Sequence, residues 1–230
     1  TGVRLADLLR EAGVRGDAKH VWFEGVDAIE SGGETIAFGG SIPLETALLE
    51  DDGAPLVAFA MNREPLRPEH GFPMRTVVPG HIGARSVKWL GKIVVSDRPS
   101  PNHYVAGAYK VVTQGTPEEW AEGEPIYRFP INSVICTPAD GAEVEAGLVR
   151  VRGYALPAGR AGETIAKVVL STDGGVSWSE ARLGAQSRQF CWRLWEAAVN
   201  LAAGPDQLIV RNLKRYLYNA WHGVTVEARS

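Results

Sequence analysis

Five basic side chains gather in one short, glycine-containing stretch of the chain: His70, Arg75, His81, Arg85 and Lys88. The glycines between them let backbone N–H groups approach a ligand closely. An arginine offers a planar fork that matches phosphate oxygens, and a lysine adds a mobile point charge. The stretch therefore predicts a site for an anionic ligand such as a phosphorylated cofactor. Ordinary surface cations beside a Pro-Gly turn are the alternative that charge density alone leaves open.

The order of residue types in this stretch resembles the cofactor-domain signature of the sulfite oxidase family. The letters HGFP at 70–73 are followed by an arginine, by PG at 79–80 and by GARSVKWL at 83–90. The resemblance implies contacts with a molybdopterin cofactor, the molybdenum cofactor, from His70, Arg75, Ser86, Val87 and Lys88. It also implies a contact from Asp27 in the segment FEGVD.

Two further residues are implied to act on the substrate. The distance in sequence from Lys88 to Tyr109 resembles that between the pterin lysine and the active-site tyrosine of family members. A phenol can hydrogen-bond a substrate oxygen and release a proton, although a core tyrosine with a satisfied hydroxyl is the alternative. Lys214 stands where the family segment NLRG has a substrate-binding arginine, so the charge is kept and the bidentate fork is lost.

Two departures from the family pattern accompany these residues. Ala108 stands where animal members often carry an aspartate just before the tyrosine. Arg211 runs directly into Asn212, where family members have an irregular segment, so either a loop is deleted or residues are absent.

The resemblance implies a molybdenum cofactor-dependent oxidoreductase that oxidises sulfite to sulfate by oxygen-atom transfer. A related molybdopterin reductase acting on nitrate or another oxyanion, and a non-catalytic dimerisation fragment, are the alternatives. The implied partners are a small oxyanion substrate, an electron acceptor such as a cytochrome, and a second copy in a homodimer. The family holds its metal through a cysteine upstream of the matching Asp27 region. We therefore expect this chain to be part of a longer enzyme and predict no metal ligand in it.

The first part of the chain must position these residues with both helices and strands. Apolar residues at helical spacing predict an amphipathic helix over residues 3–12 that ends at Gly13. His20–Gly25 and Pro55–Met61 are predicted strands, and Ser41–Glu45 is a predicted helix entry. We assign residues 1–124 to the C-terminal part of a molybdopterin-binding domain of mixed α and β structure.

The polar, acidic stretch from Gly115 to Pro130 is predicted to be a surface linker, with the domain boundary near Pro125. Beyond it, short strand-like runs recur between turn signals: Ser133–Cys136, Leu148–Tyr154, Ile165–Ser171, Phe190–Leu194, Leu208–Val210 and Val224–Ala228. The pattern predicts an all-β, immunoglobulin-like sandwich over residues 125–230. The fold class of the whole chain is thus predicted to be α+β.

The second half also resembles the dimerisation domain of molybdopterin oxidoreductases. The resemblance rests on GYA at 153–155, VLSTDGGVSW at 169–178, WRLW at 192–195 and NAWH at 219–222. The tryptophans of these segments are expected in the core: Trp178, Trp192, Trp195 and Trp221.

Composition narrows the partners further. A net charge of −3, from 24 basic and 27 acidic residues without a run of one sign, argues against nucleic-acid and membrane binding. The compartment stays open between the periplasm and the cytoplasm of a bacterium. Cys136 and Cys191 form no CxxC motif, and they are expected to be buried free thiols, with a single bridge as the alternative.

Overall fold

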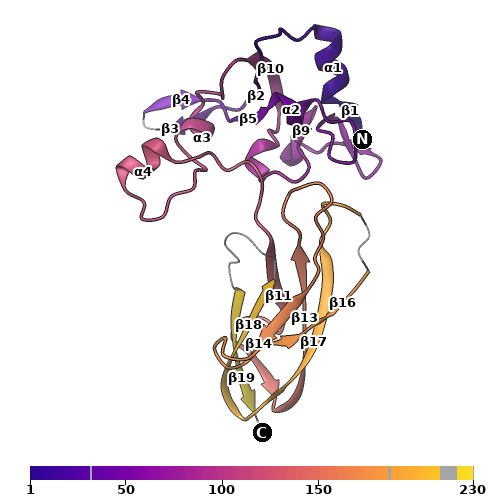
Figure 1. The fold of residues 1–230 in the computed structure, drawn as a ribbon, viewed down its shortest axis with the longest axis vertical. Coiled ribbons are helices and arrows are strands. Elements are labelled where there is room, and N and C mark those ends of the chain that lie inside the picture. The colour runs from indigo at the N-terminus through magenta and orange to yellow at the C-terminus, as the bar shows by residue number, and fades with distance from the viewer. Residues whose placement is uncertain (32, 186–187, 213–221, 230) are drawn as a thin grey trace. The chain divides into compact units, whose positions relative to one another are not determined.

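The computed structural model describes the chain except residues 32, 186–187, 213–221 and 230 (Figure 1). The chain divides into two compact units, Thr1–Phe129 and Pro130–Ser230. Strands predominate in both, and the helices are short: α1 (Leu5–Ala12), α2 (Leu44–Ala47), α3 (His103–Ala106) and α4 (Pro117–Glu122). The predicted α+β class is therefore met only in part, because the described chain is mostly β.

Two three-stranded antiparallel sheets form the first unit. One has the order β1 (Gly2–Arg4), β6 (Leu56–Ala58), β9 (Arg75–Val77), and the other β10 (Leu90–Ser96), β2 (His20–Gly25), β5 (Gly39–Pro43). Two small hairpins join β3 (Ile29–Ser31) to β4 (Glu34–Ile36) and β7 (Ala60–Met61) to β8 (Glu64–Pro65). Short 3-10 helices span Pro68–His70 and Gly83–Arg85.

The core of this unit lies between α1 and the two sheets. Leu5 and Leu9 of α1 pack in one cluster with Val21 and Phe23 of β2 and Ile42 of β5. Buried residues alternate along β2, as a strand with one face on the core requires.

Two of the four local predictions for this unit are confirmed. The predicted helix is α1, which ends at Gly13 with φ of +79°, and the predicted strand over residues 20–25 is β2. The other two predictions were only partly right. The predicted helix entry over residues 41–45 begins later, because residues 41–43 still belong to β5. The predicted strand over residues 55–61 is two short strands, β6 and β7.

The acidic stretch predicted as a linker is instead a folded loop that contains α4. Thr116 caps the helix by accepting the N–H of Glu119 at 3.3 Å. The Glu119 carboxylate in turn accepts three backbone N–H groups, those of Thr113, Gln114 and Gly115, at 2.7–3.0 Å. These bonds lower the pKa of Glu119, that of Gln114 most. The signal was present in the sequence, since Thr116 and Glu119 have capping-box spacing and Pro117 suits a first helical position.

The second unit is built from two sheets. The first has the order β11 (Asn132–Thr137), β13 (Gly147–Leu156), β17 (Arg193–Leu201), β16 (Arg182–Leu183). The second has the order β12 (Ala142–Glu145), β19 (His222–Arg229), β18 (Gly204–Asn212), β14 (Val168–Ser171), β15 (Ser179–Glu180). Side chains of both sheets share one core, including Val151, Trp195, Leu208 and Val226, so the sheets pack face to face. The predicted β-rich second half is confirmed.

The predicted core tryptophans and buried thiols fare unevenly. Trp195 is 3% exposed and lies in the core as predicted, whereas Trp192 is 62% exposed, so that prediction was wrong. Trp178 is half-buried beneath the guanidinium of Arg211 at 5.5 Å, and Trp221 lies outside the described residues. Both cysteines are free. The burial prediction was wrong for Cys136, which is exposed because it follows the core residue Ile135 on β11.

In the part of the chain that the structure describes, no helix is long and apolar enough to cross a membrane.

The turn after β14 is organised around the Asp173 carboxylate. It accepts hydrogen bonds from the hydroxyls of Ser177 and Ser171 and from the N–H of Ser177. These bonds, led by that of the Ser177 hydroxyl, lower the pKa of Asp173 from 3.8 to about 2.

Because this pKa is lowered on folding, the stabilisation by the carboxylate is complete above about pH 4 and lost as the pH falls through about 2. We expect Asp173→Asn to lower the melting temperature by a few degrees at neutral pH, and by progressively less as the pH falls through this window. Thermal unfolding followed from neutral pH to pH 2 measures this difference. Asp52→Asn, in an exposed turn, is the control. If the melting temperatures of Asp173→Asn and the wild type differ by the same amount at every pH, the Asp173 carboxylate does not stabilise this turn.

Candidate functional site

A cavity of about 270 Å³ lies within the first unit. Its lining residues come from five segments, namely the turn after β2, the connection between β4 and β5, the start of β9, the segment between β9 and β10, and the loop after α3. They are Asp27, Phe38, Arg75, Gly83, Ala84, Ser86, Lys88, Trp89 and Tyr109. Five of these are residues that the sequence predicted to contact a cofactor or substrate. Segments that lie far apart in sequence are thus brought to one cavity.

Asp27 is held at the cavity by the backbone around it. Its carboxylate accepts the N–H of Phe38 at 3.3 Å, and the backbone of Phe38 in turn accepts the N–H of Gly25 at 2.9 Å. A side chain at Gly25 would place its Cβ 2.3 Å from the Asp27 carboxylate oxygen and 3.1 Å from the carbonyl of Lys88. Only glycine allows this approach, so the end of β2 fixes the position of the carboxylate.

The Arg75 guanidinium is oriented by three backbone carbonyls. It donates to Thr76 at 3.2 Å, to His70 at 3.3 Å and to Ser86 at 2.9 Å. Burial lowers the pKa of Arg75, yet an arginine stays charged at physiological pH. Since a guanidinium carries five N–H groups and three are used here, two remain for a ligand.

Lys88 reaches a backbone carbonyl of the 3-10 helix Pro68–His70. Its ammonium donates to Glu69 O at 3.0 Å and lies 4.4 Å from the ring centroid of Trp89, whose indole N–H donates to Pro68 O at 2.8 Å. Gly71 permits this packing, because a Cβ there would lie 2.8 Å from the Lys88 Cβ. Among the described residues, neither Lys88 nor Arg75 forms an ion pair with a carboxylate. Both charges are therefore available to an anion.

Tyr109 is 43% exposed and has a backbone φ of +51°. Its carbonyl accepts the N–H of Ile126 at 2.7 Å, and its ring centroid lies 6.4 Å from that of Tyr104. Trp89, also at the cavity, has φ of +48°. Left-handed conformations are costly for large side chains and cluster at functional sites. Two such residues at one cavity support its assignment as the functional site.

His70 and Val87 do not line the cavity. The carbonyl of His70 orients Arg75, and the side chain of Val87 is fully buried in the core. The N–H of Val87 donates to Thr76 Oγ1 at 2.7 Å, so the backbone between Ser86 and Lys88 is fixed against β9. Both remain predictions as cofactor contacts. Lys214, the other predicted substrate residue, lies outside the described residues.

His81 and Arg85, two of the five basic residues of the stretch, are buried. Burial lowers the pKa of His81, whose Nδ1 lies 2.9 Å from Pro79 O. Arg85 is fully buried, and it donates from Nε to Ile126 O and from Nη1 to Tyr104 O, each at 3.0 Å. Burial also lowers the pKa of Arg85. Arg85 thus ties the segment before Ser86 to the two backbone positions that flank Tyr109.

Sequence reasoning missed four lining residues: Phe38, Gly83, Ala84 and Trp89. Gly83, Ala84 and Trp89 lie in the segment GARSVKWL, next to the predicted contacts Ser86 and Lys88, so their position in sequence could have indicated them. Phe38 carried no signal in the sequence. It reaches the cavity because Asn102 Nδ2 donates to the neighbouring carbonyl of Ala37 at 2.9 Å, which joins this loop to α3.

The donor set suits a polar, anionic ligand. The cavity is lined by two cations without a carboxylate partner, Arg75 and Lys88, and by the hydroxyl groups of Ser86 and Tyr109. The Asp27 carboxylate can accept hydrogen bonds from an amide or amine of the ligand. Within the described ranges, no group of three or more His, Cys, Asp or Glu side chains could hold a metal ion.

Comparisons with known proteins match the two halves of the chain to two different domain families. Residues 1–104 match the oxidoreductase molybdopterin binding domain, and residues 123–214 match the Mo-co oxidoreductase dimerisation domain. Mitochondrial sulfite oxidase of Drosophila melanogaster is 38% identical over 261 residues, covering 99% of this chain and 44% of that protein. An NADPH nitrate reductase of Neurospora crassa is 36% identical over 248 residues, covering 88% of this chain and 24% of that protein.

The crystal structure of the sulfane dehydrogenase SoxCD from Paracoccus pantotrophus superimposes with a TM-score of 0.76 at 28% identity, covering 95% of this chain and 52% of that one. The two matched domains define a molybdopterin oxidoreductase. Within that class, the chain belongs to the sulfite oxidase family. Its molybdopterin-binding domain implies the molybdenum cofactor. The chain spans less than half the length of the Drosophila relative.

We expect Gly25→Ala to disturb the site locally, because the new methyl group must displace the Asp27 carboxylate or the Lys88 carbonyl. Overpacking of this kind costs about 1–3 kcal/mol of unfolding free energy. Urea unfolding and cofactor content measure the two effects. Gly16→Ala, where a Cβ would meet nothing within 4 Å, is the matched control, and equal behaviour of the two variants would refute the predicted crowding.

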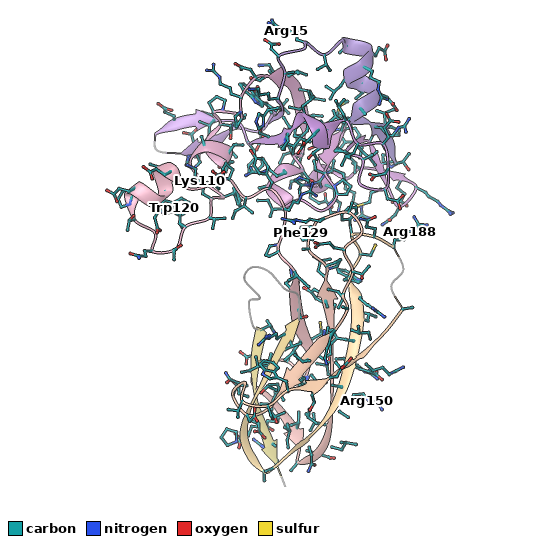
Figure 2. The ribbon with its side chains drawn as sticks, in the orientation of Figure 1. Arg15, Lys110, Trp120, Phe129, Arg150 and Arg188 are labelled. Carbon is teal, nitrogen blue, oxygen red and sulfur yellow. The ribbon has the colours of Figure 1, made fainter. Side chains whose placement is uncertain are left out.

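Arg85→Met should lower the unfolding free energy by about 2–3 kcal/mol, because two buried carbonyls lose charged donors. Arg85→Lys keeps the charge but lacks the fork that reaches both carbonyls, so it should recover only part of the loss. Arg15, whose side chain is 85% exposed and labelled on the loop after α1 in Figure 2, supplies the control Arg15→Met. If Arg85→Met proves as stable as this control, the link does not stabilise the fold.

Proposed function

We propose that this chain is part of a molybdenum cofactor-dependent oxidoreductase that oxidises sulfite to sulfate by oxygen-atom transfer. The observation that carries the proposal is the cavity of the first unit, where Asp27, Arg75, Ser86, Lys88 and Tyr109 meet. Family membership supplies the class of chemistry, and the cavity supplies residues suited to it. Residues 1–124 form the cofactor-binding part in this proposal, and residues 125–230 an immunoglobulin-like dimerisation domain.

The residues at the cavity fit the cofactor. Arg75 has two free N–H groups, and Lys88 has two of its three left after the bond to Glu69, so both can bind a phosphate group. The Asp27 carboxylate can accept from the polar edge of a pterin. Ser86 and the backbone at His70 and Val87 complete the proposed contacts. When bound, the cofactor supplies the two-electron redox centre at which oxygen is transferred.

Tyr109 is the proposed catalytic residue of this chain. Its partly exposed phenol can donate a hydrogen bond to an oxygen of the substrate and release a proton as the oxyanion product forms. Its backbone is fixed by the N–H of Ile126 and by the pairing of Lys110 with Pro125. The backbone that carries the phenol is therefore fixed before substrate binds, which lowers the entropic cost of the reaction.

Lys214 is proposed to bind the anionic substrate. It takes the position of the family arginine, and its ammonium attracts sulfite without a bidentate match. A molybdopterin reductase acting on nitrate or another oxyanion is the second candidate. The Neurospora nitrate reductase favours it, since that relative matches 88% of this chain.

A homodimer and an electron acceptor complete the proposal. The dimerisation-domain match over residues 123–214 supports a pair of identical chains. The two electrons taken from each sulfite must leave the enzyme, and a one-electron carrier such as a cytochrome is the acceptor we propose.

We expect Tyr109→Phe in the complete enzyme to lower kcat with sulfite about 100-fold, because the ring stays and only the hydroxyl donor is lost. Molybdenum and pterin content should be unchanged. Steady-state kinetics with elemental analysis measure both, and Tyr104→Phe, which lies next to Tyr109 but does not line the cavity, is the control. Unaltered kcat in Tyr109→Phe would remove this residue from the mechanism.

Substituting both free cations, Arg75→Gln with Lys88→Gln, should lower bound pterin several-fold, because the anionic group loses its charged donors. Fluorescence of the oxidised pterin released from purified protein gives this content without any assay of activity. Arg15→Gln serves as the surface control. Parallel assays of the unaltered enzyme with sulfite and with nitrate decide between the two candidate reactions, and full pterin in the double variant would refute the proposed binding site.

A further inference from the structure

A bridging segment, residues 124–128, connects Tyr109 to the backbone just before the segment GARSVKWL. On one side of it, the N–H of Ile126 donates to the carbonyl of Tyr109 at 2.7 Å. On its other side, the carbonyl of Tyr127 accepts the N–H of Ile82 at 2.9 Å. Two antiparallel bridges extend these contacts, one on each side. The loop that carries Tyr109 and the segment that carries Ser86 and Lys88 therefore meet through residues 124–128.

Arg85 fixes this bridging segment from inside the unit. Its Nε donates to the carbonyl of Ile126 at 3.0 Å, while the N–H of the same residue is bonded to Tyr109. Its Nη1 donates at 3.0 Å to the carbonyl of Tyr104 in α3, which precedes Tyr109 in sequence. One guanidinium thus holds both the hydrogen-bond partner of Tyr109 and the backbone that leads into Tyr109.

The guanidinium of Arg85 is fully buried and has no carboxylate partner among the described residues. Its Nη2 makes no hydrogen bond to any part of the chain that the structure describes. Burial lowers the pKa of Arg85 most, and the phenols of Tyr127 and Tyr109 act in the opposite direction. The guanidinium is therefore close enough to the Tyr109 phenol for their charges to interact. Because an isolated buried cation is costly, core packing alone does not account for this residue.

Tyr109 depends on restraints from outside its own side chain. Its side chain is 43% exposed, so core packing does not hold the ring, and its backbone φ of +51° is unfavourable for an aromatic residue. Such a conformation costs roughly 1–3 kcal/mol and persists only where the surrounding structure enforces it. Loosening the bond from Ile126 would let the backbone relax to negative φ and turn the phenol away from the cavity.

We propose that Arg85 is a positioning residue for Tyr109, because its hydrogen bonds to Ile126 and Tyr104 hold the strained backbone that presents the phenol to the cavity. The inference rests on the catalytic role proposed above for Tyr109. It makes that role depend on a side chain that does not itself line the cavity.

A double-mutant cycle in the complete enzyme tests the proposal. Arg85→Lys keeps the charge, but one ammonium cannot replace both Nε and Nη1. It should lower kcat with sulfite, expressed per bound molybdenum, about tenfold and change KM less than about twofold, because a catalytic group is misplaced. In a Tyr109→Phe background the same substitution should change kcat less than about twofold, since the hydroxyl it positions is already absent. Equal losses in both backgrounds would overturn the proposal.

Hydrogen exchange followed by mass spectrometry provides a readout that does not depend on activity. Peptides containing Ile126 should exchange several-fold faster in Arg85→Lys than in the wild type, measured relative to peptides of β2. Leu9→Ala is the control for lost stability, because it removes a core side chain of the same unit that is 3% exposed. It should lower the unfolding free energy and leave both kcat per molybdenum and the relative exchange at Ile126 unchanged.

The outcomes separate this inference from the proposed function. A wild-type enzyme that does not oxidise sulfite would overturn the proposed function, and exchange at Ile126 would still decide whether Arg85 holds the backbone of Tyr109. An active wild type whose kcat and Ile126 exchange are unaffected by Arg85→Lys would overturn only the positioning role. Equal losses of kcat in Leu9→Ala and Arg85→Lys would overturn it as well, by assigning the effect to stability. A loss of kcat confined to the Tyr109 background, with faster exchange at Ile126, supports the assignment.

Discussion

The buried guanidinium of Arg85 joins the segment that carries Ser86 and Lys88 to the segment that carries Tyr109. Arg85 ends the 3-10 helix Gly83–Arg85, and its guanidinium donates to the backbone carbonyls of Tyr104 and Ile126. These two residues lie before and after Tyr109 in sequence. The same arginine stacks over the Tyr127 ring at 5.3 Å, and Ile82 donates to the carbonyl of that tyrosine. A charge without a carboxylate partner is costly to bury, so the surrounding carbonyls must stay in place. The position of Tyr109 relative to Ser86 and Lys88 follows from that constraint.

Close approaches of backbone complete what Arg85 begins. Gly25 leaves room for the Asp27 carboxylate, Gly71 leaves room for Lys88, and Gly39 leaves room for Asn102, whose side chain joins the Phe38 loop to α3. Behind the loop after α3, Lys110 donates to the carbonyls of Trp120 and Ala121 at the end of α4, and Figure 2 labels Lys110 and Trp120 there. The strained backbone of Tyr109 is therefore fixed on both sides by ordinary hydrogen bonds, which is how a local conformational cost is sustained.

The sequence predicted elements and residue types better than it predicted which side chains share a cavity. Local periodicity was enough for α1 and β2, because a helix or strand with one buried face repeats its apolar residues. Density of charge was misleading in part, since His81 and Arg85 are buried supports while Arg75 and Lys88 face the cavity. No local pattern could identify Phe38, because its place depends on a hydrogen bond between residues 37 and 102. The linker prediction for the acidic stretch around α4 was wrong for another reason. Its acidic, proline-containing composition is typical of a linker, whereas the spacing of Thr116 and Glu119 is that of a helix cap.

The exposure of Trp192 follows from the alternation of side chains near the start of β17. A tryptophan in a sandwich is expected inside, and Trp195 obeys that expectation while Trp192 does not. Because side chains alternate along a strand, Trp195 and Leu194 must face opposite ways on β17, and register then carries the outward side to Tyr154 and Val134. The outward side therefore carries Tyr154 and Leu194 beside the charged Arg152 and Glu196. Apolar groups exposed in this way gain nothing in water, and only burial against another surface would make them stabilising.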